Sequence, residues 1–195
     1  MPAVENQQSR PPPDADLEAS WRAAKGDSSM LAGLWQDYGL KLLRVVSRVA
    51  DSNEMDQFLD VALQTDLNAE QTVLEQSASA GNVAVFRHVL ERMPEPLLGM
   101  NLRLGAIRGG VEIWRALLAY NRDCMNWEIG HHGDALGQAV LKRNTDLVRY
   151  LLSEGIDVQN SNFVGMPVLP AAKSIGASPE IIELLEAYGA PDEEV

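Results

Sequence analysis

The chain contains little of what several protein classes require. It has one cysteine, Cys124, among 195 residues, so no disulfide can form within the chain, and we expect a reducing compartment, the cytosol or the nucleus. No apolar run approaches the roughly 18 residues that a membrane span requires. The first residues are polar and proline-rich, so we also expect no signal peptide.

Positive charge is scarce as well. The sequence has 16 Lys and Arg against 28 Asp and Glu, which gives a formal net charge of −12. Nucleic acids and anionic membrane surfaces are bound largely through clustered positive charge. The composition therefore predicts that the chain binds neither, and that its partner is neutral or basic.

Sequence patterns of catalytic and cofactor sites are missing. There is no Cys-x-x-Cys or His-x-x-x-His, and Gly109-Gly110 lacks the Lys-Ser/Thr that completes a phosphate loop. We interpret these two glycines as a tight turn between helices and Cys124 as a small buried side chain. We expect no cofactor, no metal site and no catalytic residue, which favours a protein that is not an enzyme.

What the sequence does have is internal repetition. Four segments combine a small-residue helix end, a tight turn and a second helix with apolar residues at positions i, i+3 and i+4. They are Ser77–Leu90, Gly105–Leu118, Ala139–Leu152 and Ala171–Leu185. Repetition on this scale is typical of stacked helix pairs, because one pair cannot bury its own apolar face.

The spacing of the turns within these pairs is uneven. Two further turns precede the four, and the six lie 26, 29, 28, 34 and 33 residues apart. The turns are at Gly26, Ser52, Gly81, Gly109, Arg143 and Gly176. We infer from the shorter first three steps that the N-terminal pairs lack an extended connection that the C-terminal pairs have.

Two stretches then resemble a known repeat family. Gly133–Ala139 and Gly165–Ala172 are similar to the Gly-x-Thr-Pro-Leu-His-x-Ala motif that opens an ankyrin repeat, with Asp134 in place of the capping Thr and Gly137 in place of His. Leu147–Val158 and Ile181–Pro191 resemble the ankyrin second-helix motif, in which Gly155 and Gly189 would end the helices with left-handed backbone. The resemblance covers about residues 74–191, and its histidine-poor motifs are similar to the degenerate ankyrin repeats of fungi.

This resemblance implies an all-α ankyrin-repeat solenoid of about five to six stacked helix pairs. The solenoid would span residues 16–190, with a divergent helical part over 16–66, recognisable repeats over 67–190, and short β-hairpin-like fingers in the C-terminal half. Residues 1–15 are predicted to be a disordered proline-rich tail, and residues 191–195 a short acidic tail.

The resemblance also implies a function. Ankyrin proteins generally bind other proteins through a concave surface made of fingers and first helices, so we expect an interaction module or scaffold whose partner is another protein. The fingers are placed at Met125–Asp134 and Val158–Met166. The candidate binding residues are Trp127, Glu128, His131 and His132 on the first finger, Asn162 and Phe163 on the second, and Arg103 and Arg108 on a first helix facing the groove.

Alternatives remain for each of these residues. Trp127 and Phe163 could pack into the core, and the arginines could be ordinary solvated surface. His131, His132 and Asp134 could hold a metal, but adjacent residues of an extended segment point to opposite sides, which favours a finger tip. The rival function is an accessory or catalytic protein of a metabolic pathway, such as a secondary-metabolite pathway, with a small molecule in the groove. An enclosed pocket beside these residues would favour that rival.

Overall fold

The computed structural model describes residues 12–192. These residues form eleven α-helices, two short 3₁₀ helices and one two-stranded hairpin, which confirms the all-α fold class. Residues 1–11 of the predicted proline-rich tail and 193–195 of the predicted acidic tail lie outside the described part. The first helix begins at Asp14, inside the segment predicted to be a tail. None of the helices in residues 12–192 is long and apolar enough to cross a membrane.

The elements follow one another with short connections. In chain order they are α1 (Asp14–Ala23), α2 (Ser28–Val49), α3 (Ser52–Ala62), α4 (Ala69–Ala80), α5 (Val83–Arg92), α6 (Met100–Gly109), α7 (Val111–Tyr120), η1 (Arg122–Asn126), η2 (Gly130–His132), α8 (Ala135–Leu141), α9 (Thr145–Ser153), β1 (Asn162–Phe163), β2 (Met166–Pro167), α10 (Val168–Ser174) and α11 (Pro179–Ala187).

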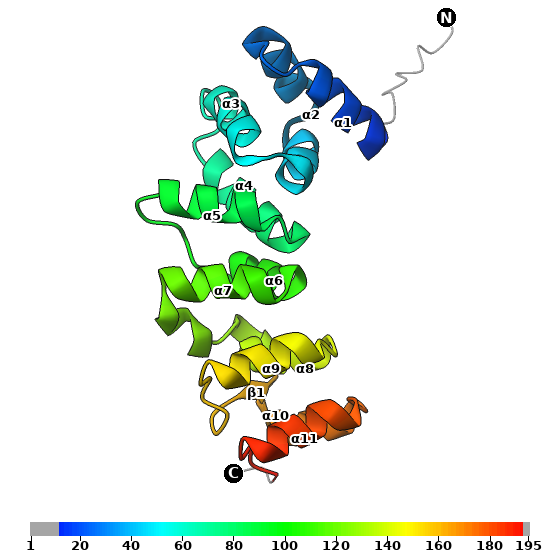
Figure 1. Cartoon of the computed structure of the whole chain (residues 1–195), viewed down its shortest axis with the longest axis vertical. Coiled ribbons are helices and arrows are strands. Elements are labelled where there is room, and N and C mark those ends of the chain that lie inside the picture. Colours follow the sequence, from blue (N-terminus) through cyan, green and yellow to red (C-terminus); the bar gives the residue numbers. More distant parts are fainter. Residues whose placement is uncertain (1–11, 193–195) are drawn as a thin grey trace, which may run out of the picture.

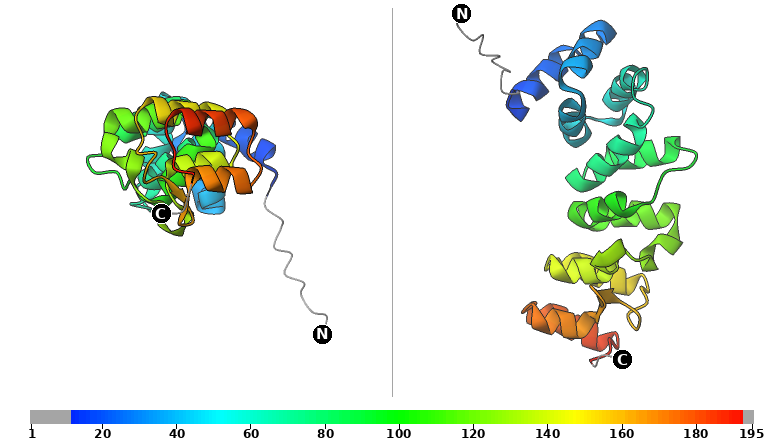
Figure 2. Two further views of the ribbon diagram at one scale, coloured as in Figure 1. Left: turned by 90° about the horizontal axis from the view of Figure 1, so that it is seen from below. Right: turned by 180° about the vertical axis from the view of Figure 1, so that it is seen from behind.

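Consecutive helices pair, and the pairs stack in one row from the N-terminal to the C-terminal end of the molecule (Figure 1). One layer of contacts runs through α2, α4, α6, α8 and α10, and a second runs through α3, α5, α7, α9 and α11. The same row is seen from behind in Figure 2. Helix α2 serves two pairs because it is broken at Gly39, whose backbone is not helical (φ 41°, ψ −121°). Its first half follows α1 and its second half precedes α3.

The core lies between the two layers. Each second helix contributes large apolar side chains to it, and Phe58 of α3, Phe86 of α5 and Trp114 of α7 are completely buried. The apolar positions recur at helical spacing, so each pair buries its stripe only against its neighbours. Stability is therefore shared along the row, and a change at one junction affects both of the pairs that meet there.

The junction between α4 and α6 is unusually close. A Cβ atom added to Gly109 would lie 2.0 Å from the carbonyl oxygen of Ala78, and one added to Gly105 would lie 3.0 Å from that of Glu75. Only residues without a side chain permit this approach. Gly110, at φ 84°, then turns the chain into α7. The predicted tight turn at Gly109-Gly110 is confirmed, and the structure adds the packing role.

Only one of the two predicted fingers contains strands. β1 and β2 pair antiparallel within the second finger, with Phe163 opposite Met166. The prediction of a β-hairpin-like finger over 125–134 is wrong, because that segment includes the end of one 3₁₀ helix, η1, and the whole of another, η2. The side chain of Asn121 accepts a hydrogen bond from the Asp123 backbone N–H, at 3.0 Å, and this starts a turn where an extended strand was expected.

Candidate functional site

The segment between α7 and α8, residues 122–134, is held down by contacts to the next helix pair. The Arg122 guanidinium lies 3.0 Å from the Glu154 carboxylate, and the Asn126 side chain accepts a hydrogen bond from the Asp157 N–H at 3.0 Å. We call this segment the first loop. Its two attachment points belong to the end of α9 and to the turn after it. The first loop is therefore fixed to the α8–α9 helix pair, and its solvent-exposed side chains are held in place.

Trp127 is the most exposed tryptophan among the described residues, with 42% of its surface accessible. The guanidinium carbon of Arg103 lies 5.7 Å from the centre of its ring, within the range of a cation–π contact. Trp127 thus lies neither in the core nor free in solvent. It covers an arginine that comes from α6.

Arg103 itself is only 9% exposed, so the expectation that it faces the groove as a surface residue is wrong. Its Nε and Nη1 atoms are enclosed and have no hydrogen-bond partner among the described residues. Burial lowers the pKa of this guanidinium. Arg103 lies two helical positions from Gly105, and so the helical repeat directs it away from the groove-lining side of α6.

Cys124 lies close to Arg103 but does not neutralise it. The thiol is completely buried, as predicted, and its Sγ donates to the Asn121 carbonyl oxygen at 2.9 Å. Burial raises the pKa of Cys124 to about 11, and the nearby Arg103 charge offsets this only in part. The cysteine is therefore a neutral thiol at physiological pH and neither a thiolate nucleophile nor an anionic partner for the arginine.

The second finger is attached to the start of α8 through Asp134. This carboxylate caps α8 by accepting from the Gly137 N–H at 2.8 Å, and it also accepts from the Asn162 N–H at 3.0 Å. A Cβ atom on either Gly133 or Gly137 would lie 2.2 Å from the Asn162 carbonyl oxygen. Asp134 is confirmed as a cap, and Gly137 leaves room for the backbone of the next finger. Burial raises the pKa of Asp134, while the hydrogen bonds from the Gly137 and Asn162 N–H groups act in the opposite direction.

The tip of the second finger is a residue that the sequence interpretation missed. Val164 and Gly165 both have positive φ, 55° and 79°, as a two-residue type I′ turn requires. For a β-branched residue this conformation is strained. Val164 is also 62% exposed, so packing does not offset the strain, whereas Phe163 is half-buried. A valine before a glycine, at a position where Asn or Asp is usual, is the signal that would have identified the tip.

Three of the predicted residues meet in an open hollow of about 430 Å³. Glu128 and His131 from the first loop line it, together with Asn162, Val164 and Gly165 from the second finger. His132 is exposed beside it, and its carbonyl oxygen accepts from the Gln138 side chain at 2.6 Å. Within residues 12–192 no group of three or more His, Cys, Asp and Glu side chains is placed to hold a metal ion.

A second open hollow lies over the first helices. Its volume is about 510 Å³, and Arg108 lines it as predicted. The remaining lining residues come from α2, α4 and α6, and are Arg44, Glu75, Gln76, Ser79, Asn101, Leu104 and Gly105. Arg44 and Arg108 are exposed and form no ion pair with the described residues. We call this surface the first-helix groove. Arg44 was not predicted, because it belongs to the part of the chain where the repeats are divergent.

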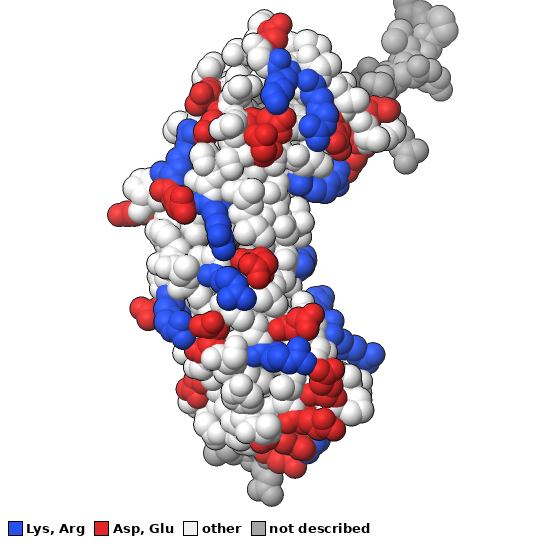
Figure 3. Space-filling view, in the orientation of Figure 1, with Lys and Arg blue, Asp and Glu red and all other residues white. Residues whose placement is uncertain are grey.

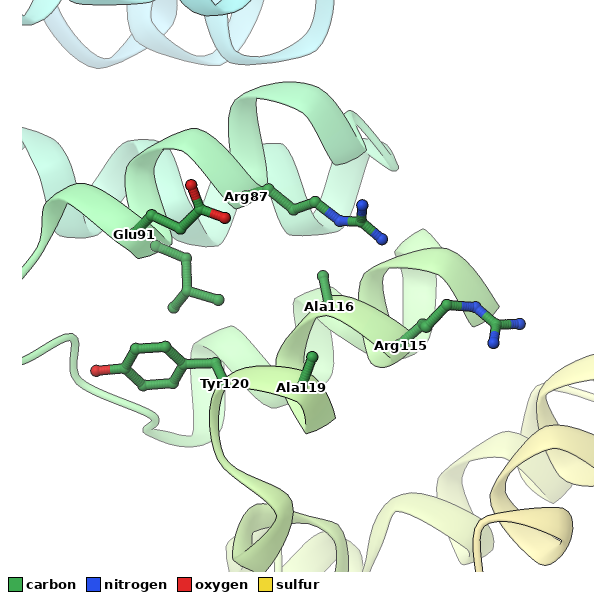
Figure 4. A pocket seen from close by; sticks show the side chains of 7 residues that line it. Arg87, Glu91, Arg115, Ala116, Ala119 and Tyr120 are labelled. Atoms are coloured by element: carbon green, nitrogen blue, oxygen red, sulfur yellow. The ribbon is translucent and has the colours of Figure 1, made fainter.

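A third depression lies on the opposite layer, between α5 and α7 (Figure 4). It has a volume of about 500 Å³. Ala116 and Ala119 point toward α5, Tyr120 lies at one end, and Arg87 and Arg115 extend at the other. Charged groups elsewhere on this face are of mixed sign, and acidic side chains gather over the C-terminal end of the molecule (Figure 3).

No protein-family model matches the chain, and no curated protein matches it. What the protein does is therefore inferred from its own sequence and geometry.

Proposed function

We propose that this chain is a non-enzymatic protein-interaction module of the ankyrin-repeat type, with degenerate repeats. It would act as a scaffold or regulator in the cytosol or nucleus. Its partner would bind across the first loop, the second finger and the first-helix groove.

The observation that carries the proposal is the tip of the second finger. Val164 holds a strained backbone conformation and leaves most of its apolar surface in solvent. Strain that no packing offsets persists at sites where function requires it. An exposed aromatic side chain, Trp127, lies on the neighbouring loop, and rigid aromatic and apolar side chains are the usual anchors of protein interfaces. A partner that buries the side chains of Val164 and Trp127 would account for the strain at Val164 and for the exposed apolar surface of both residues.

The repeat assignment has separate support. Two layers of consecutive helices, a helix cap at Asp134 and left-handed backbone at Gly155 and Gly189 (φ 85° and 78°) all agree with the motifs in the sequence. The departures are the broken α2 and the first loop, which has 3₁₀ turns where a regular repeat has strands. These departures add to the histidine-poor motifs that make the repeats degenerate.

The rival proposal is a small molecule held between Glu128, His131 and Asn162. The hollow at this place is large enough for a metabolite, since ligand pockets usually measure roughly 300–1,000 Å³. It is open to solvent, however, and such pockets normally enclose most of the ligand. The open shape fits a protein surface better.

Affinity capture with the full chain, followed by mass spectrometry of the bound proteins and small molecules, tests both proposals. We expect Val164→Asn and Trp127→Ala to lose a captured protein that the parent retains. Phe163→Ala tests the half-buried neighbour in the same way.

Leu67→Ala is the matched control, because Leu67 is an apolar side chain with 88% exposure that lies outside the fingers and the groove. Equal capture by all variants would show that the fingers do not bind the partner. Capture of a small molecule alone, lost in Glu128→Gln, would favour the rival.

A further inference from the structure

Arg103 stands out among the charged side chains of the described residues. Its Nε and Nη1 are enclosed without a partner, and it forms no ion pair with any Asp or Glu in residues 12–192. A buried charge is normally paired and hydrogen-bonded, because removing it from water is strongly unfavourable. The nearby thiol of Cys124 is protonated and does not supply the missing negative charge. The position is thus unfavourable for the isolated chain.

The surroundings of Arg103 favour an anion. It lies in the second turn of α6, a ten-residue helix whose N-cap, Gly99, provides no capping side chain. The N-terminus of a helix carries partial positive charge, which adds to that of the guanidinium. The guanidinium carbon lies 5.7 Å from the centre of the Trp127 indole, a cation–π contact that uses none of the guanidinium N–H groups as donors to an acceptor oxygen. Two parallel N–H donors match the two oxygens of a carboxylate.

We infer that Arg103 is a carboxylate-binding residue and that Trp127 is its cover. The ligand would be an acidic side chain or a terminal carboxylate of the partner protein, so the inference rests on the proposed function and names one contact of that interface. Because Nε and Nη1 are enclosed, the indole has to move aside for a bidentate contact. Trp127 lies on a loop segment and is 42% exposed, so it can rotate toward solvent without opening the core. A partner acid then replaces the cation–π contact with a charged hydrogen-bonded pair.

The inference has a spectroscopic test that needs no knowledge of the partner. The Arg103 Nε–Hε signal and the Trp127 indole signal are followed by NMR in the full-length chain and assigned by their loss in Arg103→Lys and Trp127→Phe. The probes are a short glutamate-containing peptide, its glutamine counterpart, sodium acetate and inorganic phosphate. We expect the glutamate peptide to shift both signals saturably and the glutamine peptide to bind at least about tenfold more weakly, as loss of a charged hydrogen bond predicts.

Variants separate the role of Arg103 from general charge. Arg103→Gln is expected to abolish the saturable shift of the Trp127 indole. Arg103→Lys keeps the charge but not the planar pair of donors, and is expected to weaken binding about tenfold. Arg87→Gln, which removes an exposed arginine of α5 that lies outside the first loop, the second finger and the first-helix groove, is expected to change it little. Thermal melts accompany each variant, and Arg103→Met provides a second neutral variant should Arg103→Gln fold poorly.

Each possible result either supports or overturns the assignment of Arg103 as a carboxylate-binding residue. Saturation by the peptide alone supports a protein carboxylate, and equal saturation by acetate supports the same chemistry from a free carboxylic acid. No shift with either carboxylate probe, a response to phosphate alone, or a shift that persists in Arg103→Gln would overturn the inference. If the parent and Arg103→Gln capture a partner equally, the Arg103 contact is contradicted but the proposed interaction function stands. If the peptide carboxylate binds but no partner protein is captured, the Arg103 contact stands and the proposed interaction function is contradicted.

Discussion

Helix α6 meets its two neighbours in the first-helix layer in contrasting ways. On the side of α4, Gly105 and Gly109 contribute no side chain to the contact, and the two helix backbones approach closely. On the side of α8, the segment that leads from α7 into α8 forms 3₁₀ turns, and its half-exposed Trp127 lies against the buried Arg103 of α6. The α4–α6 junction is closely packed, and its contacts are all made within this chain. The second contains an unpaired charge and exposed apolar surface, and we propose that it adds contacts to the partner beside those of the first-helix groove.

The difference follows from the length of the connections. The chain passes from α7 to α8 through residues 121–134, but from α3 to α4 through only six residues, 63–68. A longer connection leaves room for side chains that have no packing role. The same helix-pair unit thus builds a close-packed half toward the N-terminus and a surface-rich half toward the C-terminus. If the two halves differ in this way, substitutions at the α4–α6 junction cost more stability than substitutions in the first loop.

Gly109→Ala should be severely destabilising. The added methyl group would lie 2.0 Å from the Ala78 carbonyl oxygen and 2.8 Å from Cγ1 of Ile113, and neither the backbone nor a buried side chain can yield easily. We expect the free energy of unfolding to fall by about 3 kcal/mol or more, as measured by urea denaturation monitored by circular dichroism.

Gly33→Ala is the control for this substitution. Gly33 lies within α2, and nothing would approach its Cβ within 4 Å. Alanine there should stabilise the chain by roughly 0.5–1 kcal/mol, because glycine in a helix loses more backbone entropy on folding. Equal stability changes at both positions would show that the α4–α6 junction is less closely packed than described.

Asp134→Ala tests how the second finger is joined to α8. The substitution removes the α8 cap and leaves the Gly137 and Asn162 N–H groups without their acceptor. We expect a loss of about 2 kcal/mol in unfolding free energy. Faster hydrogen exchange at Asn162 and Gly165 should accompany it, while the α4–α6 junction stays protected. Uniform loss of protection along the whole row would contradict the separation of the two halves.

These two junctions also show what the sequence can and cannot predict. Helix positions and turns follow from local rules, so apolar spacing and turn residues located the pairs, and Asp134 was identified as a cap. Close approach between distant segments is not local. Nothing in the sequence near Gly137 indicates that the carbonyl oxygen of Asn162, 25 residues later, fills the space of the missing side chain. Gly109 was likewise predicted as a turn and not as a contact with α4.

The candidate site was predicted less well for the same reason. Trp127, Glu128, His131 and Asn162 lie near the expected surface because loops project from a row of helices. Arg103 was placed wrongly, since charged residues are usually exposed and its sequence neighbours do not reveal the loop that covers it. Val164 was missed because its strain depends on the turn type, which the hairpin pairing determines.

Arg103→Met should stabilise the isolated chain. Methionine has a similar length without the charge, and replacing buried charges by apolar side chains is often stabilising. The cation–π contact with Trp127 is lost, so we expect a net gain of only about 1–2 kcal/mol in unfolding free energy. Arg108→Met, at an exposed position of the same helix, should change stability by no more than about 0.5 kcal/mol. A large loss of stability in Arg103→Met would mean that the guanidinium stabilises the first loop in the free protein, and the two junctions would then be equally complete.

Trp127→Ala has the smallest expected effect on stability. The indole is nearly half exposed and contributes one cation–π contact, which is worth roughly 0.5–1 kcal/mol at such a site. Removing it also lets water reach Nε and Nη1 of Arg103, and hydration of the guanidinium offsets the lost contact. The unfolding free energy should therefore change by less than about 1 kcal/mol, while capture of the partner is lost. A change as large as that of Gly109→Ala would make Trp127 part of the core, because only a residue on which packing depends has an effect of that size when its side chain is already half in solvent.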